Sequence, residues 1–299
     1  MYWYHTLNGE LRRQFGCKLY KLTLSGGMTC PNRDGTCGTG GCAFCSGSGE
    51  FAAPAALPVP EQLARAKRLV AAKNPGGRYI AYFQDHTNTY APVSYLEPLF
   101  RAAISDPEVA VLSVATRPDC LPEDVLELLS RLNEEKPVWV ELGLQTARED
   151  TARAFNRGYA LPVYDEAMRQ LKARGIPAVV HMILGLPGET AADMEATARC
   201  IARSGALGVK LQLLHVLRGT PLAADWAAGR VETLSLEDYI TLLERCLRVL
   251  PPEIVVHRLT GDGDKKTLLA PLWSADKKRV LNEIRRRFDE DSLVQGSEA

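Results

Sequence analysis

The stretch KLYKLTLSGGMTCPNRDGTCGTGGCAFC (18–45) joins a short apolar segment to a glycine-rich loop that holds four cysteines. Residues 18–25 have the composition of a β-strand. The thiols follow that strand directly, so they lie at a strand's carboxyl end, where α/β folds place their chemistry. The loop's glycines let it fold tightly around a compact ligand. The four cysteines of the loop are Cys30, Cys37, Cys42 and Cys45.

Outward from this stretch, short apolar runs alternate with longer segments of helical period. The predicted strands are residues 18–25, 78–84, 109–116, 138–145, 177–184 and 208–216. The helices predicted between them are residues 61–73, 94–104, 122–132, 163–175 and 192–205. Such alternation predicts repeated βα units around a parallel sheet. Six units form an incomplete barrel or an open doubly wound sheet, and periodicity does not choose between the two.

Three further elements are predicted beyond the sixth strand: a helix at 234–250, a short strand at 253–259 and a helix at 276–288. Residues 46–60, rich in Ser, Gly, Pro and Ala, predict a flexible connection before the first long helix. Gly175 and Gly205 stand where two predicted helices end, as glycines that adopt a left-handed conformation do.

The bulk composition excludes several classes of protein. The chain has 299 residues and a formal net charge of +0, so no global charge attracts nucleic acid or a membrane. No apolar run reaches the roughly 18 residues that a membrane-spanning helix needs. Eight cysteines in a chain of this length, without a secretory leader, predict reduced thiols or metal ligands rather than a disulfide framework. We therefore expect a cytoplasmic protein with no membrane partner.

The number of metal-bound thiols decides the chemistry of the loop. Four thiolates would leave no open position, as in a structural zinc site or an electron-transfer cluster. Three thiolates would leave one iron of a cluster free for another ligand. Zinc sites more often pair two Cys-x2–4-Cys hooks, and here only Cys42 and Cys45 form one. Spacing alone leaves both alternatives open.

The motif Cys30-x11-Cys42-x2-Cys45, within CPNRDG and GGCAFC, resembles the cluster motif of a known family. It is similar to the YhcC/YtqA-like radical S-adenosylmethionine (radical SAM) proteins, relatives of the Elongator catalytic subunit and of oxygen-independent coproporphyrinogen oxidase. The family pattern does not require a cysteine at Cys37. The likeness runs from about residue 8 to about residue 290, and further matching segments are 83–92, 140–146, 156–159, 183–189 and 257–281.

The resemblance implies a fold and a domain organisation. The fold is an incomplete (β/α)6 barrel of the radical SAM type, with a small C-terminal extension. The implied parts are an N-terminal segment (1–16), the barrel core (17–218) and the extension with its basic helical tail (219–299).

The resemblance also implies cofactors. Cys30, Cys42 and Cys45 would hold a [4Fe–4S] cluster whose free iron binds S-adenosylmethionine (SAM), and an electron from the cluster would cleave SAM to a 5′-deoxyadenosyl radical. An electron donor such as flavodoxin or ferredoxin would supply that electron. No catalytic residue is assigned. The residues carried over are Thr87, Asn88 and Thr89 for the methionyl amine, and Glu141, Gln145 and Arg157 for the ribose, carboxylate and adenine.

Glu141 and Gln145 lie four residues apart on one predicted strand and therefore on one face of it. In an otherwise apolar strand such polar groups need partners, which a cofactor would supply. The alternative is that Glu141 pairs with Lys or Arg in a buried structural network. His181 and His215 would face the barrel interior, where a substrate role is conceivable.

The likeness to the Elongator subunit predicts that the substrate is a tRNA wobble uridine. Phosphate contacts would come from the basic C-terminal region, at Lys265, Lys266, Lys277, Lys278, Arg279, Arg285, Arg286 and Arg287. A solvated helix face is the simpler explanation of such a charge run. Two other functions remain: a radical SAM enzyme acting on a small molecule or peptide, and a non-catalytic iron–sulfur or zinc scaffold with four bound thiols, including Cys37.

Overall fold

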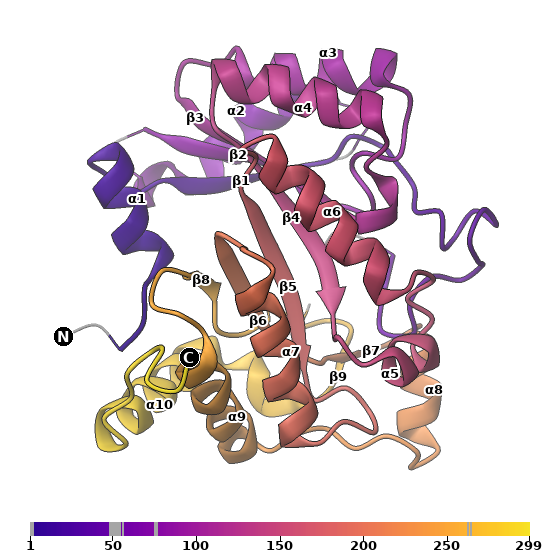
Figure 1. Cartoon of the computed structure of the whole chain (residues 1–299), viewed down its shortest axis with the longest axis vertical. Coiled ribbons are helices and arrows are strands. Elements are labelled where there is room, and N and C mark those ends of the chain that lie inside the picture. Colours follow the sequence, from indigo (N-terminus) through magenta and orange to yellow (C-terminus); the bar gives the residue numbers. More distant parts are fainter. Residues whose placement is uncertain (1–2, 48–54, 56, 75–76, 262, 264) are drawn as a thin grey trace.

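The computed structural model describes residues 3–47, 55, 57–74, 77–261, 263 and 265–299. Seven parallel strands form one sheet in the order β1-β2-β3-β4-β5-β6-β8, which curls into a half-barrel (Figure 1). The order of the strands follows the chain without reversal, whereas a doubly wound sheet reverses. The predicted incomplete barrel is therefore confirmed. Its strands are β1 (Tyr20–Leu24), β2 (Tyr79–Phe83), β3 (Val109–Thr116), β4 (Val138–Gln145), β5 (Ala178–Leu184), β6 (Gly208–Leu213) and β8 (Val255–Arg258).

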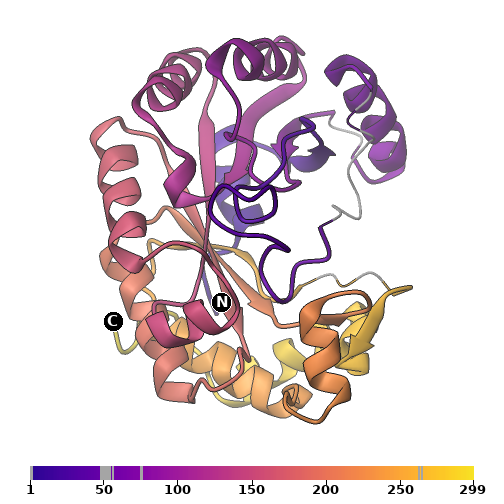
Figure 2. The ribbon, with the colours of Figure 1, turned by 90° about the vertical axis from the view of Figure 1, so that its right-hand side faces the viewer.

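Helices cover the outer face of the sheet, as Figure 2 shows. Strand residues that face outward, such as Leu112 and Leu142, are completely buried in the main hydrophobic core together with helix residues such as Leu128. Gly175 and Gly205 follow α6 and α7 with φ angles of 63° and 76°, as predicted. The covering helices are α2 (Val59–Val70), α3 (Val93–Ile104), α4 (Glu123–Glu135), α6 (Leu161–Ala173), α7 (Ala191–Arg203) and α9 (Leu236–Val249).

The amino end of the half-barrel is filled with apolar side chains. Ile80, Val111 and Trp139 are buried there together with Leu11 of α1 (Leu7–Phe15). Sequence reasoning assigned no helix to the N-terminal segment 1–16. The signals were present, since the Thr6 side chain caps this helix and Gly16 ends it with φ 72°. This end of the barrel is therefore packed with apolar side chains.

The C-terminal part of the chain completes the sheet. The short strand predicted at 253–259 is β8, which pairs in parallel with β6 and so adds a seventh strand to the six expected in the core. The predicted strand 208–216 is interrupted after Leu213. Further elements are α5 (Glu149–Ala154), β7 (Val216–Leu217), α8 (Pro221–Ala227), β9 (Leu268–Ala270), α10 (Lys277–Glu290) and the 3-10 turns η1 (Ala71–Lys73), η2 (Pro118–Cys120) and η3 (Leu272–Ala275).

Two predictions made from composition concern the connection 46–60 and membrane-spanning helices. Most of the predicted flexible connection 46–60, namely residues 48–54 and 56, lies outside the described residues. Among the described helices, none has the length and apolar character of a membrane-spanning segment.

Candidate functional site

The cysteine loop (residues 25–47) crosses the carboxyl ends of several strands. The amide of Thr87, after β2, donates to the carbonyl of Thr29 at 3.3 Å. Farther along the loop, the Ala43 amide donates to the Phe155 carbonyl at 2.9 Å, and the Ala43 carbonyl accepts from the Leu222 amide at 2.9 Å. The loop is therefore held to segments that follow β2 and β4 and to α8.

Cys30, Cys42 and Cys45 are free, partly buried thiols of this loop. The Cys45 amide donates to the Cys42 carbonyl at 2.9 Å, so these two residues form one tight turn. Burial raises the pKa of Cys42 to about 11, and the negative charges of Cys45 and Cys30 also raise it. Cys45 and Cys30 thus lie near enough to Cys42 for their charges to affect its thiol.

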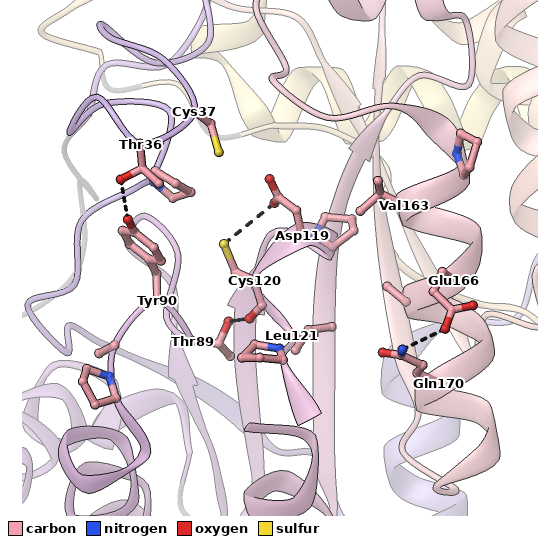
Figure 3. A pocket seen from close by; sticks show the side chains of 17 residues that line it. Thr36, Cys37, Thr89, Tyr90, Asp119, Cys120, Leu121, Val163, Glu166 and Gln170 are labelled. Carbon is pink, nitrogen blue, oxygen red and sulfur yellow. Dashed lines mark hydrogen bonds between the residues drawn. The ribbon is translucent and has the colours of Figure 1, made fainter. Parts of the chain in front are cut away.

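Cys37 lies apart from that environment. It is exposed, and its thiol points into a pocket of about 870 Å³ that we name the outer pocket (Figure 3). Apolar and aromatic side chains such as Tyr90 and Leu121 line this pocket, and the buried Cys120 thiol lies 3.8 Å from Asp119 Oδ1 within it. The lining residues are Pro31, Thr36, Cys37, residues 89–92, residues 118–122, Pro162, Val163, Glu166, Ala167 and Gln170.

Asn32 stands at the centre of the cysteine loop and has no exposed surface. Its Nδ2 lies 3.8 Å from Cys42 Sγ, whereas its Oδ1 has no hydrogen-bond partner among the described residues. A Cβ atom at Gly38 would lie only 2.6 Å from that oxygen, so a larger residue there would displace the Asn32 side chain. An orphaned buried acceptor is rare in proteins. The three thiols, the Asn32 amide donor and the unpaired Asn32 Oδ1 together suit a loop that binds a further group.

Arg117 places a cation beside the thiols. It is buried, its Nε and Nη2 donate to the Asp119 carboxylate at 2.9 and 2.7 Å, and its Nη1 donates to the Arg157 carbonyl at 2.8 Å. Its charge opposes the rise in the pKa of Cys42. Since metals bind thiolates, a fixed cation here favours ligation.

A second cavity, of about 630 Å³, occupies the interior of the half-barrel. We name it the interior cavity, and the cysteine loop contributes Phe44 and Ser46 to its wall. His181 and His215 face it, as predicted. Its polar and charged lining consists of Lys21, Thr23, Ser46, Tyr82, Gln84, Gln145, His181, Lys210, Gln212, His215, His257 and Arg258.

Glu141 lies in a charge network on the inner face of β4. Its Oε1 accepts from Lys21 Nζ at 2.6 Å and from Ser113 Oγ at 2.7 Å, and its Oε2 contacts His181 Nε2 at 2.7 Å and accepts from Lys210 Nζ. Burial acts to raise the pKa of Glu141, but the two ammonium groups hold it well below its ordinary value. Both carboxylate oxygens are therefore satisfied within the protein, as the alternative of a buried network predicted.

Gln145 and Glu141 both face the interior, although β4 is not regular between them. The pairing of β4 with β5 shifts register between Gly143 and Gln145, and Gln145 has a φ of 64°. Left-handed backbone at a non-glycine residue is uncommon and is often found at functional sites. The amide of Gln145 lines the interior cavity.

Arg157 is 1% exposed and holds the segment that follows β4. Its guanidinium donates to the carbonyls of Thr146 at 2.7 Å and Tyr159 at 2.9 Å, and pairs with Glu149 at 3.2 Å. These bonds fix the backbone of the segment between β4 and α6.

Thr87, Asn88 and Thr89 are buried where β2 leads into α3. Asn88 Nδ2 donates to the carbonyls of Phe83 and Ala115 at 3.2 and 3.0 Å, while its Oδ1 has no partner among the described residues. Thr89 Oγ1 donates to the Cys120 carbonyl at 2.5 Å, a bond drawn in Figure 3. The Asn88 Oδ1 is thus a second buried acceptor that lacks a donor.

Comparison with protein families identifies the family of the chain. The family model of the radical SAM superfamily matches residues 33–201, and the model of the Radical_SAM C-terminal domain matches residues 206–290. The chain belongs to the radical SAM superfamily. This superfamily is one of enzymes, and its members typically bind a [4Fe–4S] cluster and SAM.

Known relatives confirm the expected family. Uncharacterized protein YtqA of Bacillus subtilis is 44% identical over 295 residues, which cover 98% of this chain and 92% of that protein. Protein YhcC of Escherichia coli is 41% identical over 292 residues, covering 97% and 93%. The solved structure of Methanocaldococcus infernus Elp3 with an N-terminal deletion shares the fold, with a TM-score of 0.70 at 16% identity over 93% of this chain and 64% of that one.

The arrangement of thiols in this radical SAM chain does not suit a single ion. Among the described residues, no group of three or more His, Cys, Asp and Glu side chains could hold one metal ion. The ligands of a zinc ion converge on one centre, whereas the thiolates of a cubane bind different irons. The alternative of a zinc scaffold is tested by the metal content of the reconstituted protein.

Sequence reasoning missed four residues of this candidate site: Lys21, Asn32, Arg117 and Lys210. Two of them carried a signal in their residue type, because a lysine within an apolar strand, as at Lys21 in β1 and Lys210 in β6, needs a partner. Arg117 follows β3 directly, which is also where functional residues of barrels lie. Nothing in its residue type distinguished Asn32.

Proposed function

We propose that this chain is a radical SAM enzyme that holds its [4Fe–4S] cluster through Cys30, Cys42 and Cys45 and modifies a tRNA wobble uridine. The observation that carries the proposal is the presence of three free, partly buried thiols on one loop that also lines a polar cavity in a partial barrel. The exposed position of Cys37 in the outer pocket supports three ligands rather than four.

When bound, the cluster would supply the electron that cleaves SAM to a 5′-deoxyadenosyl radical. The protein's own residues prepare the place. Phe44 and Phe155, with ring centroids 5.2 Å apart, pack beside Cys42 and exclude water. Asn32 offers an amide hydrogen to Cys42 Sγ, and Arg117 offsets thiolate charge.

The residues proposed for SAM differ in how many of their groups remain available. Asn88 Oδ1 has no partner among the described residues and can accept a hydrogen bond from the methionyl amine. Gln145 presents its amide to the interior cavity. Glu141 and Arg157 already bond within the protein. We therefore propose that they do not contact SAM themselves but hold in place the neighbouring groups that do. Roles for Thr87 and Thr89 remain predictions.

The proposed tRNA substrate rests on the resemblance to the Elongator subunit and on the basic residues near the cavity. Lys265 and Lys266 are exposed and follow Gly263, which lines the interior cavity. Arg286 and Arg287 of α10 form ion pairs with acidic residues of their own segment, such as Glu283 and Asp291. We propose that the phosphates contact Lys265 and Lys266, because these exposed lysines lie next to the segment that lines the interior cavity. The enzyme would act in the cytoplasm with flavodoxin or ferredoxin as its electron donor.

Anaerobic reconstitution tests the radical chemistry. The wild-type protein should bind iron and, when reduced with SAM present, release 5′-deoxyadenosine, detected by liquid chromatography. Cys45→Ala should release none, and Cys200→Ala, which removes a thiol on the distant α7, should match the wild type. Zinc in place of iron, or no 5′-deoxyadenosine, would overturn the proposal.

Mass spectrometry of tRNA nucleosides tests the proposed substrate. A strain that lacks the gene should lose or accumulate one modified wobble uridine, and complementation with wild type but not with Cys45→Ala should restore the profile. An unchanged profile from an enzyme that does form 5′-deoxyadenosine would indicate a small molecule or peptide substrate instead.

A further inference from the structure

Two lysines share one carboxylate inside the half-barrel. Lys21 Nζ of β1 lies 2.6 Å from Glu141 Oε1, and Lys210 Nζ of β6 donates to Glu141 Oε2. We name Lys21 and Lys210 the lysine pair. Both ammonium groups also lie over the ring of Tyr82, at 4.5 and 4.6 Å from its centroid. The pair thus converges from opposite sides of the sheet's inner face onto Glu141 and Tyr82.

The charges at this point do not balance. The side chain of Glu141 is 0% exposed and that of Lys210 is 6% exposed, and one carboxylate faces two ammonium groups. Among the described residues that line the interior cavity, none is an aspartate or a glutamate. Burial of an uncompensated charge is costly, and one answer is visible here, since burial lowers the pKa of Lys210 to about 7.

The lysine pair lies at the floor of the interior cavity. Lys21 precedes the end of β1 by three residues, and Lys210 precedes the end of β6 by three, which places both about 10 Å below the strand ends. Nearer the mouth, three glutamine amides line the same cavity: Gln84, Gln145 and Gln212. A ligand that enters from the mouth would meet amides first and cations last.

A neighbouring group also lacks a partner. His257 lines the cavity, and its Nδ1 is buried without a hydrogen bond among the described residues. Burial holds the pKa of His257 well below its ordinary value, so the ring is neutral and offers one donor and one acceptor nitrogen. The floor of the cavity therefore combines excess positive charge with an unused polar atom.

We propose that the lysine pair binds an oxyanion carried by the substrate, either a carboxylate or a phosphate, at the floor of the interior cavity. The oxyanion supplies the second negative charge that Lys21 and Lys210 lack and accepts their remaining N–H hydrogens. The glutamines hold the polar part of the substrate that links the oxyanion to the mouth. This inference rests on the proposed function for the identity of the substrate, and it restricts that substrate to an anionic class.

Thermal unfolding of anaerobically purified protein tests the proposal with simple probes. Sodium acetate, sodium phosphate and sodium chloride are compared at equal ionic strength, and acetamide serves as the neutral analogue of acetate. Acetate or phosphate should raise the unfolding midpoint above that in chloride and with saturation, as a ligand specific to the folded state does. Acetamide should not. Preference for acetate identifies a carboxylate on the substrate, and preference for phosphate identifies a phosphoester.

Lysine variants locate the bound anion. Lys21→Met should weaken the apparent affinity at least tenfold, and Lys21→Arg, which keeps the charge, should retain it. Lys18→Met is the matched control, because Lys18 also lies over a tyrosine ring, at 4.2 Å from Tyr20, but is exposed. Lys21→Gln is a second variant if the methionine variant does not fold.

An equal response to anions in Lys21→Met and wild type would overturn the inference, as would no difference between the anions and chloride. These measurements need no reduction and no SAM. Failure of the inference is therefore distinct from failure of the proposed function, which is measured as 5′-deoxyadenosine.

Discussion

The cysteine loop separates two cavities of opposite character. Phe44 and Ser46, on either side of Cys45, line the interior cavity, which holds the lysine pair and three glutamines. Pro31 and Cys37, earlier in the loop, line the outer pocket, where most side chains are apolar. The two spaces have similar volumes, about 630 and 870 Å³, so size does not distinguish them.

The difference lies in what their polar groups are bonded to. In the interior, Lys210 and His181 each bond to Glu141 across neighbouring strands. Gln145 has a left-handed backbone, and His257 Nδ1 has no hydrogen-bond partner in the part of the chain that the structure describes. In the outer pocket, the Glu166 carboxylate bonds to Arg169 and Gln170 of its own helix. The longer-range bonds of this pocket, from Thr89 Oγ1 to the Cys120 carbonyl and between Thr36 Oγ1 and Tyr90 Oη, join uncharged groups. Long-range ion pairs and unmet polar groups in the interior of a barrel indicate a site, whereas ion pairs between neighbours on one helix indicate surface.

The sharpest test of this comparison uses one cysteine on each side. Cys42→Ala should abolish the cluster, since the two remaining thiolates cannot hold it, whereas Cys37→Ala should keep it. Iron content and the visible absorbance of anaerobically reconstituted protein measure both. Retention of the cluster in Cys42→Ala together with its loss in Cys37→Ala would reverse the assignment of the two sides.

A second test removes Glu141, which bonds to the lysines that line the interior cavity, and compares it with Glu166 of the outer pocket. Glu141→Ala leaves two buried ammonium groups without their counter-ion, so it should lower the free energy of unfolding by about 3–5 kcal/mol. We expect the lower end, because the Lys21 side chain is 22% exposed and can turn toward solvent. Glu166→Ala, the matched change in the outer pocket, removes only exposed local pairs and should have little effect.

Chemical denaturation of the two variants beside wild type measures this contrast. Equal losses of unfolding free energy in the two variants would show that the bonds of Glu141 across the barrel stabilise the protein no more than those of a surface carboxylate. The comparison of the two cavities would then fail at its main point.

Much of the fold could be predicted from the sequence, because strands buried on both faces form apolar runs of recognisable length. The predicted strand at 109–116 has the bounds of β3, and the thiols lie at the carboxyl end of β1 as expected. The partial barrel itself came from the family resemblance, since alternation alone suits both barrels and open sheets. The N-terminal helix was missed because its nine residues carry few apolar side chains.

The candidate site was less predictable, and the reason is topological. Glu141 was singled out, but its partners come from β1 and β6, 120 and 69 residues away in sequence. Which lysine meets which carboxylate depends on strand register across the curled sheet, and a register is not visible in one strand alone. Asn32 and Arg117 likewise acquire their roles only when the loop folds over the strands.

The smallest expected effect concerns how stability depends on pH. Burial lowers the pKa of Lys210 from 10.5 to about 7, so between these values the unfolded chain binds a proton that the folded protein does not. Stability should therefore rise as pH increases through this range, by at most about 1.4 kcal/mol per pH unit. Lys210→Met should remove that part of the slope while leaving Lys21 and Glu141 as a balanced pair.

Lys172→Met is the control and should keep the wild-type slope, because it removes an exposed lysine of α6, the helix that lines the outer pocket. Unfolding midpoints of the three proteins measured from pH 7 to about pH 10 decide the matter, because a slope that Lys210→Met shares with wild type would mean that Lys210 keeps its proton inside the barrel.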